Sequence, residues 1–274
     1  MVVLTAFADE ISSDLNEQLD TLESEGIHHL ELRGVWGKNV LDLSEQEIVQ
    51  IKQTLNERGF RVSSIGSPIG KIHITDDFEP HLGRAKHAVE LAKFFHAPYV
   101  RIFSFYIPEG EADIYRNEVL HRMKQLAQVA EAEGVVLLHE NESHIYGDNG
   151  ERCLDILQAC DSPHLRAAFD PANFVQCRIE PVSQAYPLLS DYISYIHIKD
   201  AIKETGAVVP AGEGDGQLRE LLQHLMAKGF SGYMSLEPHL KAEGSRQGLS
   251  KPELFVVTSQ ALKRLLEEQA ISWT

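Results

Sequence analysis

The sequence predicts an α/β protein, a single (β/α)8 barrel over residues 1–274, from three observations. Short runs rich in β-branched and aromatic residues recur eight times, and their starts lie 27 to 39 residues apart. Helix-capping and helix-ending residues lie between these runs, an alternation typical of parallel strands with crossover helices. A chain of 30.7 kDa also has the size of one closed barrel.

The main alternative is an open, doubly wound sheet. Such a sheet usually carries a glycine-rich loop after its first strand, and residues 7–11 (FADEI) contain no glycine. We therefore expect a closed barrel. Its eight strands begin, in chain order, at Val2, His29, Arg61, Tyr99, Val135, Leu165, Ile193 and Gly232.

Helix signals fit between these strands. Ser12, Ser13 and Asp14 can cap a first helix that Gly26 ends, because serine and aspartate side chains accept the free amides of a helix start. Ser44 with Glu47 three residues later predicts a capping box for a second helix. Apolar residues at helical spacing predict a final helix over about residues 251–269.

Charge and cysteine content narrow the class of protein. The formal net charge of −16 repels nucleic acid. No apolar run is long enough for a spanning helix, and the first ten residues do not resemble a signal peptide, so we expect no membrane partner. The cysteines are odd in number and lack the paired spacing of a zinc or redox motif, which favours a cytoplasmic protein with reduced thiols.

Four consecutive predicted strands end in titratable side chains. These are Glu140, Asp170, His197 and Glu237. Because side chains alternate along a strand, each shares a face with the residue two positions before it, so all four can point into the barrel mouth if those faces point inward. Three carboxylates there would repel one another unless a cation lay between them. Alternatively, a single acid at a strand end caps a helix or anchors a loop.

The type of ligand indicates the type of metal. Three carboxylates and one imidazole offer mostly hard oxygen atoms, which suit Mn²⁺ or Mg²⁺, with Co²⁺ or Zn²⁺ also acceptable to the imidazole. The sequence therefore predicts one divalent metal ion held by Glu140, Asp170, His197 and Glu237.

Short motifs along the chain resemble the xylose isomerase-like TIM barrel superfamily, in its sugar phosphate isomerase/epimerase branch. In order, they are FADEIS, LELRG, SSIGSPIG, HEN, FDPAN, HIKD, GEGDG and SLEPH. The resemblance implies the same four metal ligands, and relatives in this superfamily include ketose 3-epimerases and inosose dehydratases. The epimerases carry a histidine three residues after the aspartate, where this chain has Asn173.

The predicted reaction is metal-dependent isomerisation or epimerisation of a sugar or sugar phosphate. A metal with open positions can hold a hydroxyl and a neighbouring carbonyl, acidify the carbon between them and stabilise an enediolate. Glu140 and Glu237, which enter from different strands, are the candidate acid/base pair. In similar epimerases one such glutamate removes a proton and the other returns it.

Further residues near the strand ends are candidate substrate contacts. Lys199 can meet a substrate anion or hydroxyl, or it can be a surface lysine paired with Asp200. Loop glycines between residues 212 and 216 can present amides to an anion or belong to a mobile lid. The predicted substrate-binding residues are His144, Asn173, Lys199, Arg101 and Lys71.

Other functions stay open. A keto-sugar or inosose dehydratase, a lyase, can use the same metal site, and a barrel that binds sugar without catalysis is a further alternative. Endonuclease IV-like DNA repair needs several more histidine ligands and a basic groove, which the charge of −16 does not favour. We expect a small carbohydrate as substrate and allow for a homo-oligomer.

Overall fold

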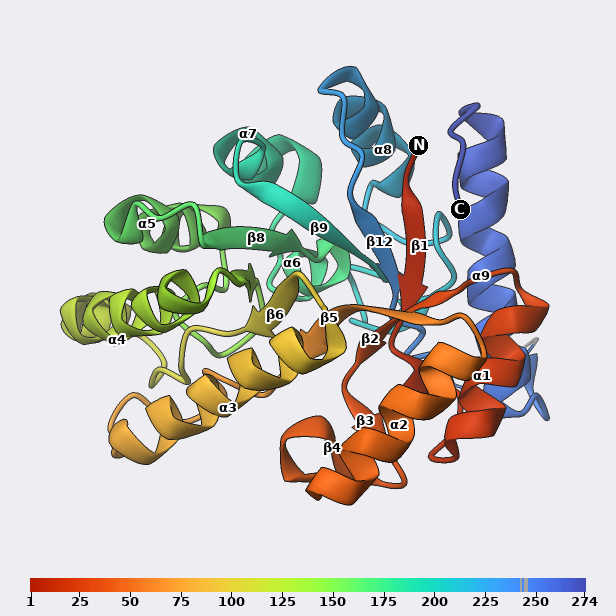
Figure 1. The fold of residues 1–274 in the computed structure, drawn as a ribbon. Helices are drawn as coiled ribbons and strands as arrows, with labels where there is room; N and C mark the ends of the chain where they lie inside the picture. The colour runs from red at the N-terminus through yellow and green to blue at the C-terminus, as the bar shows by residue number, and fades with distance from the viewer. Residues whose placement is uncertain (242, 244–245) are drawn as a thin grey trace.

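Eight parallel strands form a nearly closed barrel with helices packed around its outside (Figure 1). The computed structural model describes residues 1–241, 243 and 246–274. All eight predicted strands are confirmed as the barrel strands. They are β1 (Val3–Ala6), β2 (His29–Leu32), β5 (Arg61–Gly66), β6 (Tyr99–Ile102), β7 (Val136–Glu140), β8 (Leu165–Phe169), β9 (Ile193–Ile198) and β12 (Tyr233–Leu236).

Neighbouring strands pair in the order β1-β12-β9-β8-β7-β6-β5-β2. This order places β1 and β2 at the two ends of the sheet, and in the described part of the chain no backbone ladder joins them. Arg33, just after β2, instead contacts Asp9 and Glu10, just after β1, at 2.8 and 3.0 Å. These ion pairs, together with a hydrogen bond from the Trp36 amide to the Ser13 carbonyl at 2.6 Å, connect the two ends of the sheet.

Helices follow the strands as the capping signals predict. Asp14 accepts the amide of Glu17 at the start of the first helix, and Ser44 and Ser250 each form a capping box. The helices are α1 (Leu15–Ser24), α2 (Glu45–Glu57), α3 (Glu79–Phe95), α4 (Ala112–Glu133), α5 (Gly150–Cys160), α6 (Pro171–Gln176), α7 (Tyr186–Leu189), α8 (Leu218–Ala227) and α9 (Lys251–Glu268). Short helices η1 (Ala8–Glu10), η2 (Val40–Asp42) and η3 (Pro181–Ala185) and the small hairpins β3 (Gly34–Val35) with β4 (Lys38–Asn39) and β10 (Asp200–Ala201) with β11 (Val208–Val209) complete the described elements.

The glycine-rich loop after β9 wraps around a carboxylate that belongs to the chain itself. The backbone amides of Gly212, Gly214 and Gly216 donate hydrogen bonds to the buried Asp200 at 2.9, 3.0 and 2.8 Å. A Cβ atom on Gly214 would lie 2.4 Å from Asp200 Oδ1, so only glycine allows this close approach. The amides that the sequence predicts for an anion are thus used inside the fold.

The cysteines and the helices also bear on the class of protein. Cys153, Cys160 and Cys177 are free thiols. Among the residues that the structure describes, no helix combines the length and the apolar character needed to cross a membrane.

Candidate metal centre and active site

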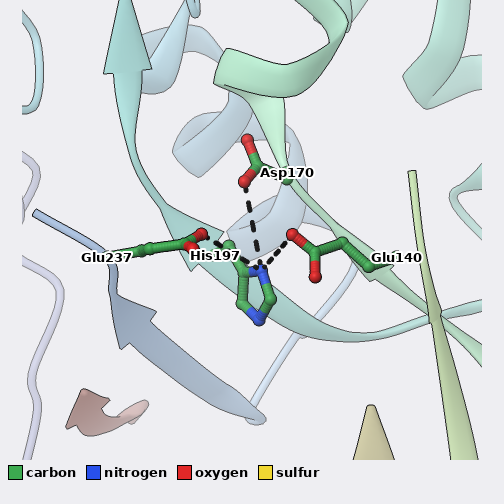
Figure 2. Close-up of side chains that lie close together, drawn as sticks. All are labelled: Glu140, Asp170, His197 and Glu237. Atoms are coloured by element: carbon green, nitrogen blue, oxygen red, sulfur yellow. Dashed lines mark ion pairs between the residues drawn. The ribbon is translucent and has the colours of Figure 1, made fainter. Parts of the chain in front are cut away.

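Four side chains from consecutive barrel strands converge at the carboxyl end of the barrel (Figure 2). His197 Nδ1 lies 3.0 Å from Glu140 Oε1, 4.0 Å from Asp170 Oδ2 and 3.8 Å from Glu237 Oε2. One ligand atom from each of the four residues lies within 4.8 Å of the others. The strand-end residues singled out in the sequence are therefore brought together in one cluster.

The strands explain why these side chains meet. Glu140 is the last residue of β7, Asp170 follows β8, His197 lies within β9, and Glu237 follows β12. Parallel pairing of β12 with β9 aligns Ser235 with His197, so Glu237 lies two residues further toward the carboxyl end of the barrel and on the same face as Ser235. All four residues are buried, since none is more than 4% exposed. Burial at this end of a barrel is typical of a site rather than of a surface ion pair.

The donor set fits a hard divalent cation. Asp170 Oδ2 and His197 Nδ1 are buried and make no hydrogen bond in the described structure, although charged neighbours lie near both. A buried polar atom without a hydrogen-bond partner is costly, so both atoms are available as ligands. Burial lowers the pKa of the His197 imidazole, but Glu140 and Glu31 raise it by more, well above its ordinary value. The cluster therefore favours positive charge at its centre.

The far side of the His197 ring faces a carboxylate outside the four predicted ligands. Glu31, on β2, is 1% exposed, and its Oε2 lies 3.3 Å from His197 Nε2. Phe7 and Tyr195 pack edge-on against the imidazole at centroid distances of 5.2 and 5.7 Å. If Nδ1 bound a metal, Nε2 would keep its proton and could donate it to Glu31, which would fix the orientation of the ring.

Arg101 and Asn173 hold the Glu140 carboxylate. Arg101 Nη1 donates to Glu140 Oε2 at 2.7 Å, and Asn173 Nδ2 donates to Oε1 at 3.2 Å. Burial raises the pKa of Glu140, but His197 and Arg101 lower it by more, so its net pKa is below the ordinary value. Both predicted substrate contacts thus lie in the site, where each one orients this carboxylate.

Cations also surround Glu237. Lys199 Nζ lies 3.1 Å from Glu237 Oε2 and 2.8 Å from Asp170 Oδ2. His239 Nε2 lies 2.9 Å from Glu237 Oε1, and Arg33 lies 3.5 Å from the same oxygen. The alternative of a surface pair between Lys199 and Asp200 is wrong, because the buried Lys199 contacts Asp170 and Glu237 while Asp200 accepts the amides of the loop after β9.

A cavity of about 210 Å³ opens above this cluster. Lys71, Arg101, Lys199, Glu140 and Glu237 are among its lining residues. Lys71 packs 4.2 Å from the Phe103 ring centroid, with its ammonium 3.4 Å from Glu142.

The structure does not bring His144 to this cavity, although it comes from the same loop as Glu142. Its side chain is exposed, and it is not among the residues that line the cavity. Its backbone instead has φ 65°, and its carbonyl accepts a hydrogen bond from the amide of Ile107.

The fold and the site define a (β/α)8 barrel with a buried carboxylate and histidine cluster at the carboxyl ends of its strands. Residues 19–253 match the family described as xylose isomerase-like TIM barrel. The chain belongs to this family.

Individual relatives agree with this assignment. The fructoselysine 3-epimerase of Shigella flexneri is 28% identical over 162 residues, which span 57% of this chain and 58% of the relative. A solved structure titled D-tagatose 3-epimerase-like protein has a TM-score of 0.78 at 19% identity, and the match covers 97% of this chain and 98% of that one. The IolI protein, solved with a bound zinc atom, has a TM-score of 0.78 at 16% identity, with coverage of 98% and 99%. At such low identities the two structures show a shared fold.

Proposed function

We propose that this chain is a divalent-metal-dependent epimerase or isomerase that acts on a ketose-type sugar, free or phosphorylated. The observation that carries the proposal is the approach of two glutamates to one cluster from strands β7 and β12, which are separated by β8 and β9 in the sheet. The family and the epimerase relative support a sugar substrate. The convergence of three carboxylates and one imidazole, with ligand atoms within 4.8 Å of one another, supports a metal.

Each residue of the cluster has a definite task in this proposal. Glu140, Asp170, His197 and Glu237 hold the ion, which when bound polarises the oxygen atoms of the substrate and makes the carbon between them more acidic. One glutamate carboxylate removes the proton from that carbon, and the other returns a proton on the opposite face.

The neighbours of the two glutamates keep them in place. Arg101 and Asn173 fix the orientation of Glu140. Lys199 and His239 contact the two oxygens of Glu237. Each carboxylate is therefore ionised and oriented toward the cavity before substrate arrives, and preorganised groups of this kind lower the barrier without rearrangement during the reaction.

The substrate-binding residues complete the proposal. Lys71, Arg101 and Lys199 line the cavity and can donate hydrogen bonds to sugar hydroxyls or to a substrate anion. Asn173 contacts Glu140 from below, and His144 reaches a bound sugar only if its loop moves. We further propose a cytoplasmic protein of one domain over residues 1–274, with a small carbohydrate rather than nucleic acid as its partner; the net charge of −16 supports the last point.

Solvent proton exchange tests the reaction directly. The manganese-loaded enzyme is incubated in D₂O with ketoses, ketose phosphates and fructoselysine, and deuterium incorporation is followed by ¹H NMR. We expect exchange at one carbon next to the carbonyl, together with an epimeric or isomeric product. A product with new ultraviolet absorbance from a conjugated carbonyl would instead assign a dehydratase. Absence of exchange with every substrate, with metal bound, would indicate a sugar-binding barrel without catalysis.

A matched pair of variants tests the assigned glutamates. Glu237→Gln keeps the size of the side chain but removes the carboxylate, so the rate should fall at least about 100-fold, the usual contribution of a general base. Glu142→Gln makes the same change at a residue that lines the same cavity outside the cluster. The control should lose little activity. Equal losses in the two variants would remove Glu237 from the proposed mechanism.

A further inference from the structure

A second cavity opens at the opposite end of the barrel, where the strands begin. Its volume is about 330 Å³, within the lower range of natural ligand pockets. His29, Arg61 and Tyr233 line it from the starts of β2, β5 and β12. Lys52 of α2 and His96 after α3 complete its polar wall. The residues of the candidate active site play no part in this cavity.

The cavity is basic in a strongly acidic protein. His29, Lys52, Arg61 and His96 line it, and no aspartate or glutamate does. Over the residues that the structure describes, none of these four side chains lies within 4.0 Å of a carboxylate oxygen. Arg58, only three residues before Arg61, is by contrast paired with Asp20 at 2.8 Å and also with Glu23. The chain as a whole has a net charge of −16, so a cavity lined by four basic side chains without a paired carboxylate stands out from the rest of the molecule.

Two local effects show that the positive charge is not neutralised from within. Burial lowers the pKa of His29, and the nearby Arg61 lowers it further. Burial also lowers the pKa of Lys52, whose ammonium lies 5.9 Å from the Phe95 ring centroid. An anion in the cavity would relieve both effects, because it would stabilise the charged forms.

The partial negative charge of two helix C-terminal ends opposes an anion in this cavity, but it is smaller than the positive charge of the lining side chains. Helices α2 and α3 end beside the cavity, at Glu57 and Phe95. Each helix end carries about −0.5 charge, so the two together contribute about −1. Lys52 and Arg61 contribute two positive charges, and the two histidines add hydrogen-bond donors. The balance, about one positive charge, stays positive and favours an anion.

We propose that this cavity is a binding site for a phosphate group, carried by inorganic phosphate or by a small phosphate monoester such as a sugar phosphate. A phosphate monoester has a charge of about −1.5 to −2 at pH 7 and three acceptor oxygens. Lysine and arginine side chains are the usual partners of such a group. The aromatic wall formed by Phe60 and Phe95 leaves room for the apolar face of an attached sugar.

Binding of inorganic phosphate tests the site. Titration calorimetry of the whole chain is run at low ionic strength, since salt screens such contacts. The wild type should bind phosphate saturably, and the double variant Lys52→Gln with Arg61→Gln should bind at least about tenfold more weakly. The control double variant, Lys86→Gln with Arg264→Gln, removes the same charge from exposed residues outside the cavity and should bind like the wild type.

Fructose 6-phosphate and fructose separate the two possible sources of the phosphate. Tighter binding of the ester than of phosphate, lost in the Lys52/Arg61 variant, would identify a sugar phosphate; equal binding would identify inorganic phosphate. Fructose should show no binding that depends on Lys52 and Arg61. Circular dichroism confirms that the variants fold, and the single variants Lys52→Gln and Arg61→Gln replace the double if it does not. Unchanged phosphate affinity in the variant, or no saturable binding to the wild type, would overturn the proposal.

Discussion

Replacing Asp200 with asparagine should weaken the fold, because the loop after β9 is built on its carboxylate. Oδ1 accepts the amides of Ala201 and Gly216 at 2.9 and 2.8 Å, and Oδ2 accepts those of Gly212 and Gly214 at 2.9 and 3.0 Å. Asparagine keeps only one oxygen, so two amides would face an NH₂ group that cannot accept. A hydrogen bond to a charged group contributes about 1.5–3 kcal/mol, so the free energy of unfolding should fall by about 3–6 kcal/mol.

Thermal unfolding followed by circular dichroism measures this effect. At about 2 °C per kcal/mol for a domain of this size, the melting temperature should drop by about 6–12 °C. Asp215→Asn makes the same change in the same loop, at an exposed carboxylate that accepts only the Lys203 amide at 2.7 Å among the described hydrogen bonds. This control should shift the melting temperature by about 2 °C or less. Equal shifts in the two variants would refute the role of Asp200 as the anchor of the loop.

Three more predictions follow from side chains described above. Glu31→Leu should lower the affinity for Mn²⁺ by about 10- to 100-fold in calorimetry, and Glu31→Gln should lower it by less. The control Glu142→Gln should leave the affinity unchanged. An unaltered affinity in Glu31→Leu would contradict the role of Glu31 in orienting the histidine ligand. Addition of Mn²⁺ at about 100 times its Kd should stabilise the fold by about 2.7 kcal/mol in thermal unfolding, and a chelator should reverse this; no shift would argue against a metal in the folded protein. Burial, together with the nearby Arg84 and Arg122, lowers the pKa of His81 to about 4, so as pH falls the folded protein binds this proton at a lower pH than the unfolded chain. The free energy of unfolding should therefore decrease between about pH 6.5 and pH 4, and His81→Gln should show a shallower decrease in urea titrations; identical pH profiles would contradict this.

The sequence predicted much of the barrel and the centre of its site, for a physical reason. Each of the eight strands is a short apolar run between helix signals, and both signals are local in the chain. Glu140, Asp170, His197 and Glu237 could be grouped because parallel strands end at the same side of a barrel. Alternation along each strand then placed them on one face.

Residues that act through distant partners could not be predicted in the same way. Glu31 sits in an ordinary strand, and only the closed barrel brings it to His197 in β9, across the barrel. His239, the last residue of the SLEPH motif, has φ 42°, and in this left-handed conformation its Nε2 lies 2.8 Å from Glu10. The glycines near residue 214 left an anion site and a mobile lid as alternatives, and the pattern could not reveal that their amides bind the chain's own Asp200.

Because no backbone ladder joins β1 and β2, we expect the barrel to open locally between these two strands more easily than between the others. Every other neighbouring pair of barrel strands is held by a backbone ladder, whereas at this joint Arg33 pairs with Asp9 and Glu10 and the Trp36 amide donates to the Ser13 carbonyl. Ion pairs of this kind weaken as salt rises, so deuterium should enter the amides beside this joint sooner at high ionic strength. Arg33 also lies 3.5 Å from Glu237, so opening of the joint would withdraw a positive charge from a proposed catalytic carboxylate. The Arg33 guanidinium therefore links the contact between β1 and β2 to the proposed catalytic carboxylate of Glu237.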